Sequence, residues 1–441
     1  MTFLSGWGRT APTPATLVTP RTPSELAALV TGAPSRGLIA RGLGRAYGDA
    51  AQNAGGVVVD LAGMEARWSL DPSTGVVTAT AGMSLHDLMR ALVPRGWFVP
   101  VTPGTRHVTL GGAVAADVHG KNHHVDSSFG AHLRSLTLVT ADGASRTLGP
   151  GDELFWATVG GMGLTGLITE VSFACVPVET SRMRVDVERT RDLDHTLEVM
   201  TATDDRYRYT VAWIDLLARG PRMGRSVLTR GDHARRDELP AGEDPLAFAP
   251  ASRLPAPPWA PNGLLNGLTV RAFNEAWYAK SRERRIIQDL APFFHPLDFV
   301  NGWNRVYGSR GFVQYQFVVP FGEEGTLRRI VSRLSSEGVV SFLTVLKRFG
   351  AGTPGMLSFP LPGWTLALDI PSGQAGLAGL LRGFDEWVAG AGGRLYLAKD
   401  ARMRAELLPV MYPRLPEWRK IRESADPGEV FRSDLARRLA L

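Results

Sequence analysis

Residues 103–120 read PGTRHVTLGGAVAADVHG, and this glycine-rich stretch decides the fold. Two other segments share its character, ARGLGRAYGDA at residues 40–50 and ATVGGMGLTGLITEV at residues 157–171. Glycine allows a backbone to turn with positive φ, and it lets amide groups approach a ligand without a Cβ in the way. Three such segments, each beside an apolar strand or helix, predict an extended ligand that lies along the backbone over a long distance.

The first of these segments starts like a dinucleotide-binding fingerprint but does not complete it. Gly42 and Gly44 follow a strand-like run, yet Tyr47 stands where the third glycine is needed. Polar GDAAQNAGG then follows, where a Rossmann unit would begin an apolar helix. The pattern therefore disfavours a fold of the NAD-binding type.

Length and charge narrow the class of protein. A chain of 441 residues suits two domains or one large discontinuous domain. Its net charge of +6 comes from scattered Lys and Arg, without the basic runs of a nucleic-acid binder. This diffuse charge fits an anionic substrate or an anionic membrane surface, and it is equally typical of an arginine-rich proteome. We expect no nucleic-acid partner.

Cysteine content and terminal sequence bear on the compartment. The single cysteine, Cys175 in the apolar run VSFACVPV, excludes an intrachain disulfide and is interpreted as a buried structural residue. The N-terminus has no basic region followed by an apolar core, and no apolar run is long enough to span a membrane. We expect a cytoplasmic protein, free or peripheral at the inner membrane, with the periplasmic side left open.

The order of strands and helices predicts an α+β fold. Short strands, few helices and many glycines precede Pro177, and residues 181–250 are interpreted as charged and irregular. Strands at 311–320, 340–350 and 364–371, with a helix at 326–338, predict an antiparallel sheet backed by helices. We expect a first domain over 1–178, a second over 179–392, and a return of 393–441 to the first.

The three glycine segments together resemble the FAD-binding domain of the vanillyl-alcohol-oxidase family. Further stretches extend the likeness nearly end to end: GWGRTAP, PGTRHVTLGGAVAADVHGKNHH, ELFWATVGGMGLTG, HPLD, GFVQYQF, SFPLPGW, GRLYLAKDAR and MYPRLPEW. They resemble the branch of that family that oxidises a polyprenyl-phosphoryl ribose. The resemblance implies a two-part FAD-binding domain and a separate substrate domain.

The resemblance also implies a reaction and its partners. The expected substrate is decaprenylphosphoryl-β-D-ribose or a similar polyprenyl-phosphoryl ribose, whose C2 hydroxyl becomes a ketone. This step is the first half of an epimerisation that supplies arabinose to the cell wall, and an NAD(P)H-dependent short-chain reductase completes it. The electron acceptor stays open, with a quinone among the candidates. The alternative is an FAD oxidase of the same fold that acts on a soluble sugar, alditol or nucleoside.

The resemblance assigns the cofactor bed residue by residue. Arg45 stands where members with covalently attached FAD usually have His, so the FAD is expected to be non-covalent. The expected cofactor-binding residues come from the glycine segments and from GRLYLAKDAR: Arg41, Gly42, Leu43, Gly44, Arg45, Ala46, Tyr47, Gly104, Thr105, Thr109, Gly111, Gly112, His119, Gly120, Gly163, Ile168, Tyr396 and Lys399.

Three of these residues are also candidates for catalysis. His119 has a suitable pKa range for accepting the hydroxyl proton, although water or a neighbouring Lys could accept it instead. Lys399 is expected to stabilise the negative charge on reduced flavin, and without the family likeness it would read as a surface lysine. Tyr47 is a candidate near the reacting hydroxyl, or a phenol that only packs on the flavin.

Substrate-binding candidates come from both parts of the chain. The resemblance points to Lys121, Gln316 and Lys347 for a phosphate or for sugar hydroxyls, and Gln314 shares a strand face with Gln316. From residues alone, a solvated strand face and an exposed strand end are equally credible. Apolar walls are expected from Trp213 and Phe294.

Two positions depart from the mycobacterial members of this branch. Those members have Cys, the target of activated nitroaromatic inhibitors, where Ala367 stands here, and they usually have Tyr where Phe294 stands. Neither change touches the cofactor bed. The identity of the substrate is therefore the part of the likeness that these changes affect.

The histidine cluster in AADVHGKNHH offers a different class of function, a metal hydrolase. His119 and His123 would need a helix to share a face, and Gly120 and Asn122 disfavour one. No HExxH pattern accompanies them. We therefore expect no metal site, and a non-catalytic scaffold would leave three cofactor-type glycine segments without a purpose.

Overall fold

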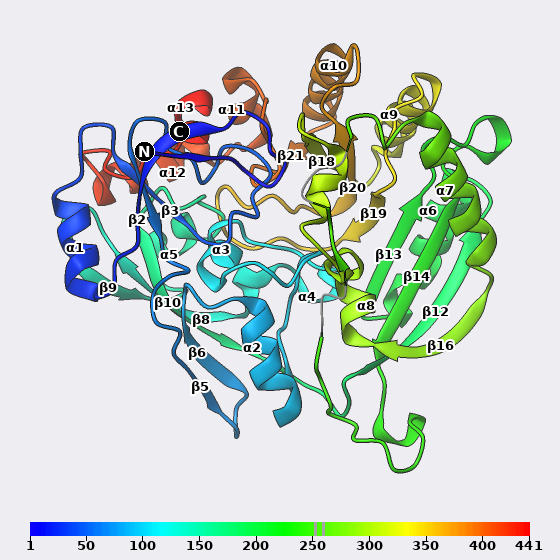
Figure 1. Ribbon diagram of the computed structural model, residues 1–441, viewed down its shortest axis with the longest axis horizontal. Helices are drawn as coiled ribbons and strands as arrows, with labels where there is room; N and C mark the ends of the chain where they lie inside the picture. Colours follow the sequence, from blue (N-terminus) through cyan, green and yellow to red (C-terminus); the bar gives the residue numbers. More distant parts are fainter. Residues whose placement is uncertain (251–253, 258–260) are drawn as a thin grey trace.

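Two sheets form the N-terminal part of the computed structural model, which describes residues 1–250, 254–257 and 261–441. The first is mostly parallel, in the order β1-β2-β4-β3, and the second is antiparallel, in the order β5-β6-β10-β8-β9. In Figure 1 both lie on the left. Their strands are β1 (Thr2–Leu4), β2 (Thr13–Val18), β3 (Leu38–Arg41), β4 (Val57–Asp60), β5 (Trp68–Asp71), β6 (Val76–Thr80), β8 (Leu133–Val139), β9 (Ser145–Leu148) and β10 (Leu167–Ala174). A short pair, β7 (Trp97–Phe98) and β11 (Val176–Pro177), follows at their margin.

Short capped helices connect these strands. In α2 the Ser84 hydroxyl accepts a hydrogen bond from the Asp87 amide at 3.0 Å, which satisfies a free N–H at the helix start. Leu85, Leu88 and Leu92 then fall on one buried face. The helices of this part are α1 (Pro23–Thr31), α2 (Leu85–Leu92), α3 (Leu110–Ala115), α4 (His123–Asp126) and α5 (Glu153–Thr158).

An eight-stranded antiparallel sheet forms the right half of Figure 1, in the order β16-β12-β14-β13-β19-β20-β18-β21. Its strands are β12 (Arg182–Thr190), β13 (Tyr209–Ile214), β14 (Ser226–His233), β16 (Arg284–Asp289), β18 (Phe312–Pro320), β19 (Thr344–Phe349), β20 (Gly363–Pro371) and β21 (Arg394–Leu395). The helices around it are α6 (Leu193–Thr203), α7 (Gly267–Lys280), α8 (Leu290–Phe294), α9 (Glu324–Ser336) and α10 (Leu377–Gly390), with a short parallel pair, β15 (Leu254–Pro255) and β17 (Val300–Asn301). The predicted α+β fold with an antiparallel sheet backed by helices is confirmed.

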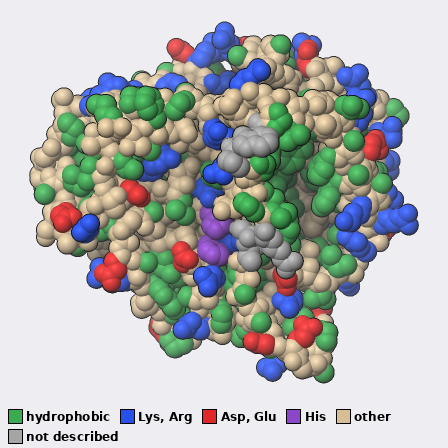
Figure 2. Space-filling view, in the orientation of Figure 1, with side chains coloured by type: hydrophobic (Ala, Val, Ile, Leu, Met, Phe, Trp, Pro, Cys, Tyr) green, Lys and Arg blue, Asp and Glu red, His purple; other side chains and the backbone are tan. Residues whose placement is uncertain are grey.

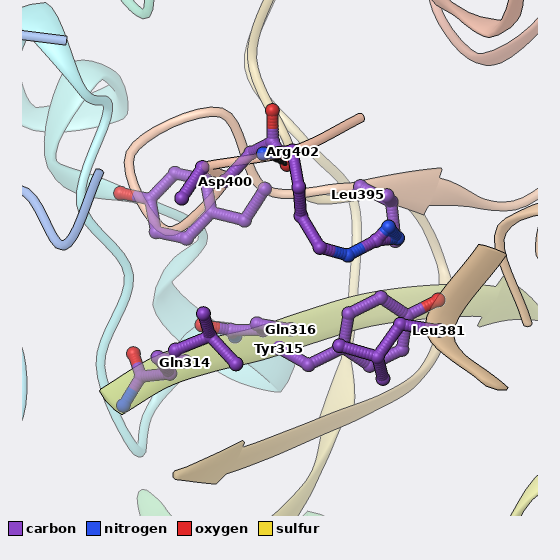
Figure 3. Close-up of a pocket in the computed structure, with 10 residues that line it drawn as sticks. Gln314, Tyr315, Gln316, Leu381, Leu395, Asp400 and Arg402 are labelled. Carbon is purple, nitrogen blue, oxygen red and sulfur yellow. Dashed lines mark hydrogen bonds between the residues drawn. The ribbon is translucent and has the colours of Figure 1, made fainter. Parts of the chain in front are cut away.

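The two faces of this sheet have different surroundings. Leu228, Ile214 and Phe317 face a buried core shared with α6, α9 and α10. Tyr315 also points to that side, toward Leu381 and away from its neighbours Gln314 and Gln316 (Figure 3). Strand alternation therefore turns both glutamines to the opposite face.

The interpretation of residues 181–250 as irregular was wrong. This part contains β12, α6, β13 and β14. β12 reads RMRVDVERT, in which charged side chains alternate with Met183, Val185 and Val187. This period of two is typical of an antiparallel strand with one polar face, and its high charge hid it.

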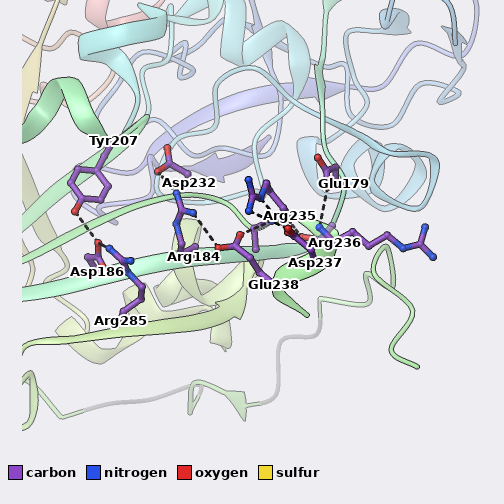
Figure 4. Close-up of polar contacts among 12 residues, drawn as sticks. Glu179, Arg184, Asp186, Tyr207, Asp232, Arg235, Arg236, Asp237, Glu238 and Arg285 are labelled. Carbon is purple, nitrogen blue, oxygen red and sulfur yellow. Dashed lines mark hydrogen bonds and ion pairs between the residues drawn. The ribbon is translucent and has the colours of Figure 1, made fainter. Parts of the chain in front are cut away.

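The charged face of β12 is tied to its neighbours by ion pairs (Figure 4). Asp186 accepts hydrogen bonds from Arg285 at 2.7 Å and from the Tyr207 hydroxyl at 2.8 Å, and Arg184 contacts Glu238 at 3.1 Å. Exposed pairs of this kind contribute little stability each. They leave the other face of β12, with Val187, free to line a cavity.

The end of the chain joins the two halves. β21 pairs with β18, and the following residues return to the N-terminal sheets, where Leu38 bridges Phe431 and the Trp418 indole donates to the Ala157 carbonyl at 2.9 Å. The returning helices are α11 (Leu408–Met411), α12 (Leu415–Ala425) and α13 (Asp434–Leu439). The expected domain limits at residues 178 and 392 stay predictions.

Candidate active site

A cavity of about 700 Å³ is lined jointly by the glycine segments and by the eight-stranded sheet. Every residue expected from the sequence to bind cofactor or substrate lines it, from Arg41 to Lys399. Side chains expected at this site, separated by hundreds of positions in sequence, are thus brought together. Figure 2 shows the molecule hollowed beside hydrophobic side chains, with histidine at the centre of the same face.

The glycine segments form one wall of the cavity, where the glycines expose backbone atoms to the cavity without a side chain in between. A Cβ at Gly42 would come within 2.2 Å of the Thr109 hydroxyl, so no larger residue fits there without movement. Gly44 has φ +62° and Gly163 has φ +77°, in the left-handed region that glycine enters at no steric cost. Such a wall fits an extended cofactor with a pyrophosphate, as the sequence predicts for FAD.

Arg45 extends this wall toward the N-terminus. Its guanidinium lies 3.7 Å from the centroid of the Trp7 ring, and burial lowers its pKa. The Trp7 amide donates to the Ala46 carbonyl at 2.7 Å, so the first residues of the chain cover the first glycine segment. Trp7 was not among the expected site residues, although GWGRTAP contained the signal.

Three partly buried lysines, Lys121, Lys347 and Lys399, give the cavity a cationic character. Burial, with a contribution from Lys347, lowers the pKa of Lys121 to about 7, and burial lowers that of Lys347 to about 8. Burial also lowers the pKa of Lys399 to about 7. The Lys121 ammonium donates to the Phe293 carbonyl and lies over the ring of the same residue. Ammonium groups held away from water favour an anion among them.

His119 contacts Gln316 of β18 and lies within the electrostatic reach of Lys347 and Lys399. Its Nε2 is 2.9 Å from the Gln316 amide nitrogen. An amide NH₂ can only donate, so this contact assigns the proton of neutral His119 to Nδ1, which is buried without a hydrogen-bond partner in the described part of the chain. Burial, with Lys347, His123 and Lys399, holds the pKa of His119 well below its ordinary value.

The three histidines of the cluster have different surroundings. The His123 ring packs 4.3 Å from the Phe349 ring, whereas His124 Nε2 contacts the Asp204 and Tyr207 carbonyls at 3.1 and 2.9 Å. Within residues 1–250, 254–257 and 261–441, no group of three or more His, Cys, Asp or Glu side chains is arranged to hold a metal ion.

A buried carboxylate lies directly behind the catalytic candidates. Asp369 pairs with Gln314 across β20 and β18, and it accepts a hydrogen bond from the Gln314 amide. Burial raises the pKa of Asp369 to about 7, and Asp369 in turn raises that of Lys399. The Lys399 ammonium lies 3.8 Å from the centroid of the Tyr47 ring. Sequence reasoning missed Asp369, whose only signal was an acid within the apolar strand GWTLALDIP.

Burial also fixes the protonation of Tyr47. The side chain is 9% exposed, and burial, reinforced by Asp369, raises the pKa of its phenol well above the ordinary value. A phenol in this state keeps its proton and can donate a hydrogen bond into the cavity.

The cavity changes character across the sheet. At the β18 and β19 end it is lined by Gln314, Gln316 and Lys347, with Ala367 of β20 between them. Toward the other edge the lining is mainly apolar, through Trp213, Val211, Val227, Val187 and Ile286, with Thr229, Gln288 and Arg284 among them. Neighbouring strands are about 4.8 Å apart, so the passage from β18 to β16 spans roughly 29 Å.

The two aromatic walls are held by packing and hydrogen bonding. The Trp213 indole donates to the Phe342 carbonyl at 3.0 Å. Phe294 packs against Phe98 and Tyr209, with ring centroids 5.1 and 4.9 Å away. A fixed indole and a fixed phenyl ring thus flank the cavity where the polar lining ends.

Comparison with known proteins identifies the family. Residues 14–149 match the family model described as FAD binding domain. The chain is 47% identical to decaprenylphosphoryl-beta-D-ribose oxidase of Mycolicibacterium smegmatis, over 99% of this chain and 97% of that protein. It is 43% identical to an uncharacterized protein in the mprA 5' region of Streptomyces coelicolor, over 81% of this chain and 100% of that protein. It is 25% identical to L-gulono-1,4-lactone dehydrogenase of Mycobacterium tuberculosis, over 99% of this chain and 98% of that protein.

These matches define the class first. The chain is an FAD-dependent oxidoreductase, as the sequence predicted. Within that class it belongs to the family of decaprenylphosphoryl-β-D-ribose oxidase. No helix in the described ranges of the chain has the length and apolar character needed to cross a bilayer.

Proposed function

We propose that the protein oxidises the C2 hydroxyl of decaprenylphosphoryl-β-D-ribose, or of a similar polyprenyl-phosphoryl ribose, to the 2-keto sugar. The observation that carries this proposal is the change of the cavity lining from cationic and polar to mainly apolar across one sheet. A sugar phosphate on a long hydrocarbon has the same change of character along its length. The 47% identical oxidase, whose name gives this substrate, supports the assignment.

Different residues of the cavity would bind the phosphate, the sugar and the hydrocarbon of this substrate. Lys121 and Lys347 bind the phosphate, and Gln314 and Gln316 hold sugar hydroxyls. Trp213 and Phe294 enclose the first part of the hydrocarbon. FAD, when bound along the glycine segments, would supply the acceptor for the two electrons, and Lys399 in its protonated form would place a positive charge at the wall of that bed.

Proton acceptance at the substrate hydroxyl has three candidates in the cavity. His119 was the first choice from sequence, yet its strongly lowered pKa makes it a weak base. Lys121 and Lys399 have pKa values of about 7, where a base is partly unprotonated at neutral pH and still strong enough to take a proton. We therefore place these two lysines beside His119 as candidates.

The cofactor and the partners complete the proposal. We propose that FAD is held non-covalently, because Arg45 offers no imidazole for attachment; acid precipitation should leave the flavin in the supernatant. The 2-keto product would pass to an NAD(P)H-dependent short-chain reductase that restores the alcohol with inverted configuration. A quinone would take up the electrons, and the enzyme would work peripherally at the membrane that holds its substrate.

Anaerobic titration with a panel of sugars tests the function. Polyprenyl-phosphoryl ribose should bleach the flavin absorbance, and free ribose, alditols and nucleosides should not. The second candidate is an oxidase of a soluble sugar, favoured by the similarity to L-gulono-1,4-lactone dehydrogenase and by 27% identity to alditol oxidase over 36% of this chain. Bleaching by an alditol or a lactone, and not by the lipid-linked ribose, would establish that candidate instead.

A further inference from the structure

Several large apolar side chains on and next to α7 are exposed to solvent. Single exposed apolar residues are normal on a protein surface, but a contiguous group calls for a partner. The group, called here the α7 patch, consists of Leu264, Leu268, Phe273 and Trp277, with 45%, 79%, 44% and 42% of each side chain exposed. The Phe273 and Trp277 rings stack with centroids 6.3 Å apart.

The packing of α7 explains why the patch stays exposed. Val270 and Asn274 are the buried residues of the helix, one turn apart, and the Asn274 amide donates to Asp215 at 2.7 Å. This row fixes one side of α7 to the protein. The start of the helix is held by Leu265, which packs in the cluster of Trp303 and Phe312. Leu268 lies on the outward side of α7, whereas Phe273 and Trp277 lie on a flank of the helix that borders the cavity.

The α7 patch is continuous with the active-site cavity. Phe273 and Trp277 belong to both, since they also line the apolar end of the cavity together with Ser281 and Ile286. Hydrophobic side chains surround the hollow on this face of the molecule (Figure 2). A hydrocarbon chain that leaves the apolar end therefore emerges directly at the patch.

The rim of the patch is basic. Residues 264–285 contain five Lys and Arg side chains and two acidic ones. Arg271, Lys280, Arg282 and Arg284 are exposed. Of the two acidic residues, Glu275 is paired with Arg225 at 2.7 Å and Glu283 is exposed. Apolar and tryptophan side chains inside a basic rim are the arrangement by which interfacial helices bind anionic lipid.

We propose that the α7 patch docks the enzyme on an anionic lipid bilayer, so that the hydrocarbon of the substrate passes from the membrane into the apolar end of the cavity. This proposal rests on the proposed lipid-linked substrate for its purpose, and on the exposure, continuity and charge of the patch for its location. Leu268 and Leu264 enter the acyl region, and the basic rim contacts the lipid headgroups.

Vesicle flotation with the FAD-loaded protein tests the docking. We expect the protein to float with vesicles that contain phosphatidylglycerol, less with pure phosphatidylcholine, and less again at high salt. Leu268→Asp should lower the bound fraction by about tenfold or more, because a buried leucine side chain is lost to the bilayer. Phe3→Asp is the matched control, since Phe3 is 73% exposed on β1, next to the N-terminus that Figure 1 marks far from α7, and it should float like the wild type.

A second pair of variants isolates the charge of the rim. Lys280→Glu should weaken flotation with anionic vesicles and leave the weak binding to neutral vesicles unchanged. Lys420→Glu, on the exposed side of α12, makes the same change of net charge and should have no effect. Equal losses in both variants would overturn the basic rim as a headgroup contact.

The remaining outcomes separate the docking from the function. Absence of flotation by the wild type, or equal losses in Leu268→Asp and Phe3→Asp, would overturn the docking. A wild-type dimer that Leu268→Asp dissociates without lipid would show that a second copy covers the patch, which also overturns the docking.

The flavin of Leu268→Asp should still be reduced at the wild-type rate by a short-chain, water-soluble polyprenyl-phosphoryl ribose. If no such compound bleaches the flavin while flotation still depends on Leu268, the function fails and the docking stands.

Discussion

At the scale of single residues, Asp369 changes the pKa of a catalytic candidate, Lys399. It raises the pKa of Lys399, which burial lowers to about 7. In Asp369→Asn we therefore expect the pKa of Lys399 to fall further, so that this lysine loses its proton at lower pH. Any rate of flavin reduction that needs protonated Lys399 should then decline at a lower pH than in the wild type, as stopped-flow measurements across the neutral range would show. A pH profile identical to that of the wild type would contradict this role.

Lys347 acts on Lys399 in the opposite direction, and it also acts on His119 and Lys121. Its charge lowers the pKa values of His119, Lys121 and Lys399. Lys347→Met should therefore raise all three, and it should move the decline of flavin reduction to higher pH, against the shift expected for Asp369→Asn. The loss of a phosphate contact should also raise KM for the lipid-linked substrate more than it lowers kcat. Shifts of the two variants in the same direction would refute this electrostatic account.

Ala367 stands where the mycobacterial members of the family have the cysteine that nitroaromatic inhibitors attack. It is 7% exposed, and it lines the polar end of the cavity between Gln316 and Lys347. Alanine has no nucleophile, so activated nitroaromatic compounds should leave the protein mass unchanged at this position. Ala367→Cys should gain one covalent adduct, which intact-protein mass spectrometry and peptide mapping would detect. An adduct on the wild type that maps to β20 would be incompatible with this expectation.

At the scale of elements, a buried ion pair fastens the second glycine segment to the segment before β17. Asp298 accepts from the Thr105 hydroxyl at 2.7 Å and from the Arg106 amide at 2.9 Å, and the Arg106 guanidinium is 3.5 Å away. Asp298→Ala would leave the buried Arg106 charge uncompensated, which typically costs about 3 kcal/mol or more. Chemical denaturation should report that loss, together with weaker retention of FAD.

A surface ion pair provides the matched control for this prediction. Arg146 and Asp142 lie 2.7 Å apart with about half of each side chain exposed, 54% and 52%. Asp142→Ala should change the free energy of unfolding by less than about 1 kcal/mol. Equal losses in the two variants would mean that burial does not distinguish the Arg106 pair.

Elements also mark the limit of what the sequence could predict. The strands at 311–371 were found because apolar runs bounded by glycine and proline are visible without a partner. β12 was missed because charges dominate its outer face. Pairing registers are not written in local sequence, so the approach of Asp369 to Gln314 across β20 and β18 could not be predicted.

At the scale of the whole molecule, the cofactor class and the location of the site followed from the glycine segments and the family resemblance. The roles of individual residues did not follow as far. His119 was ranked first as a proton acceptor on its ordinary pKa, and that ranking could not include the lysines that the fold brings next to it. Charge and burial in a cavity depend on which distant segments meet, and only the folded chain supplies that information.

The return of the chain after β21 has a mechanical consequence. The polypeptide passes between the N-terminal sheets and the eight-stranded sheet first after β11 and again at Tyr396, whose hydroxyl is hydrogen-bonded to the Ala116 carbonyl at 2.8 Å. Two covalent crossings, and hydrogen bonds such as that from the Thr210 amide to the Lys121 carbonyl at 2.9 Å, connect the halves on either side of the cavity. Any change in the width of the cavity therefore has to be accommodated at both crossings together.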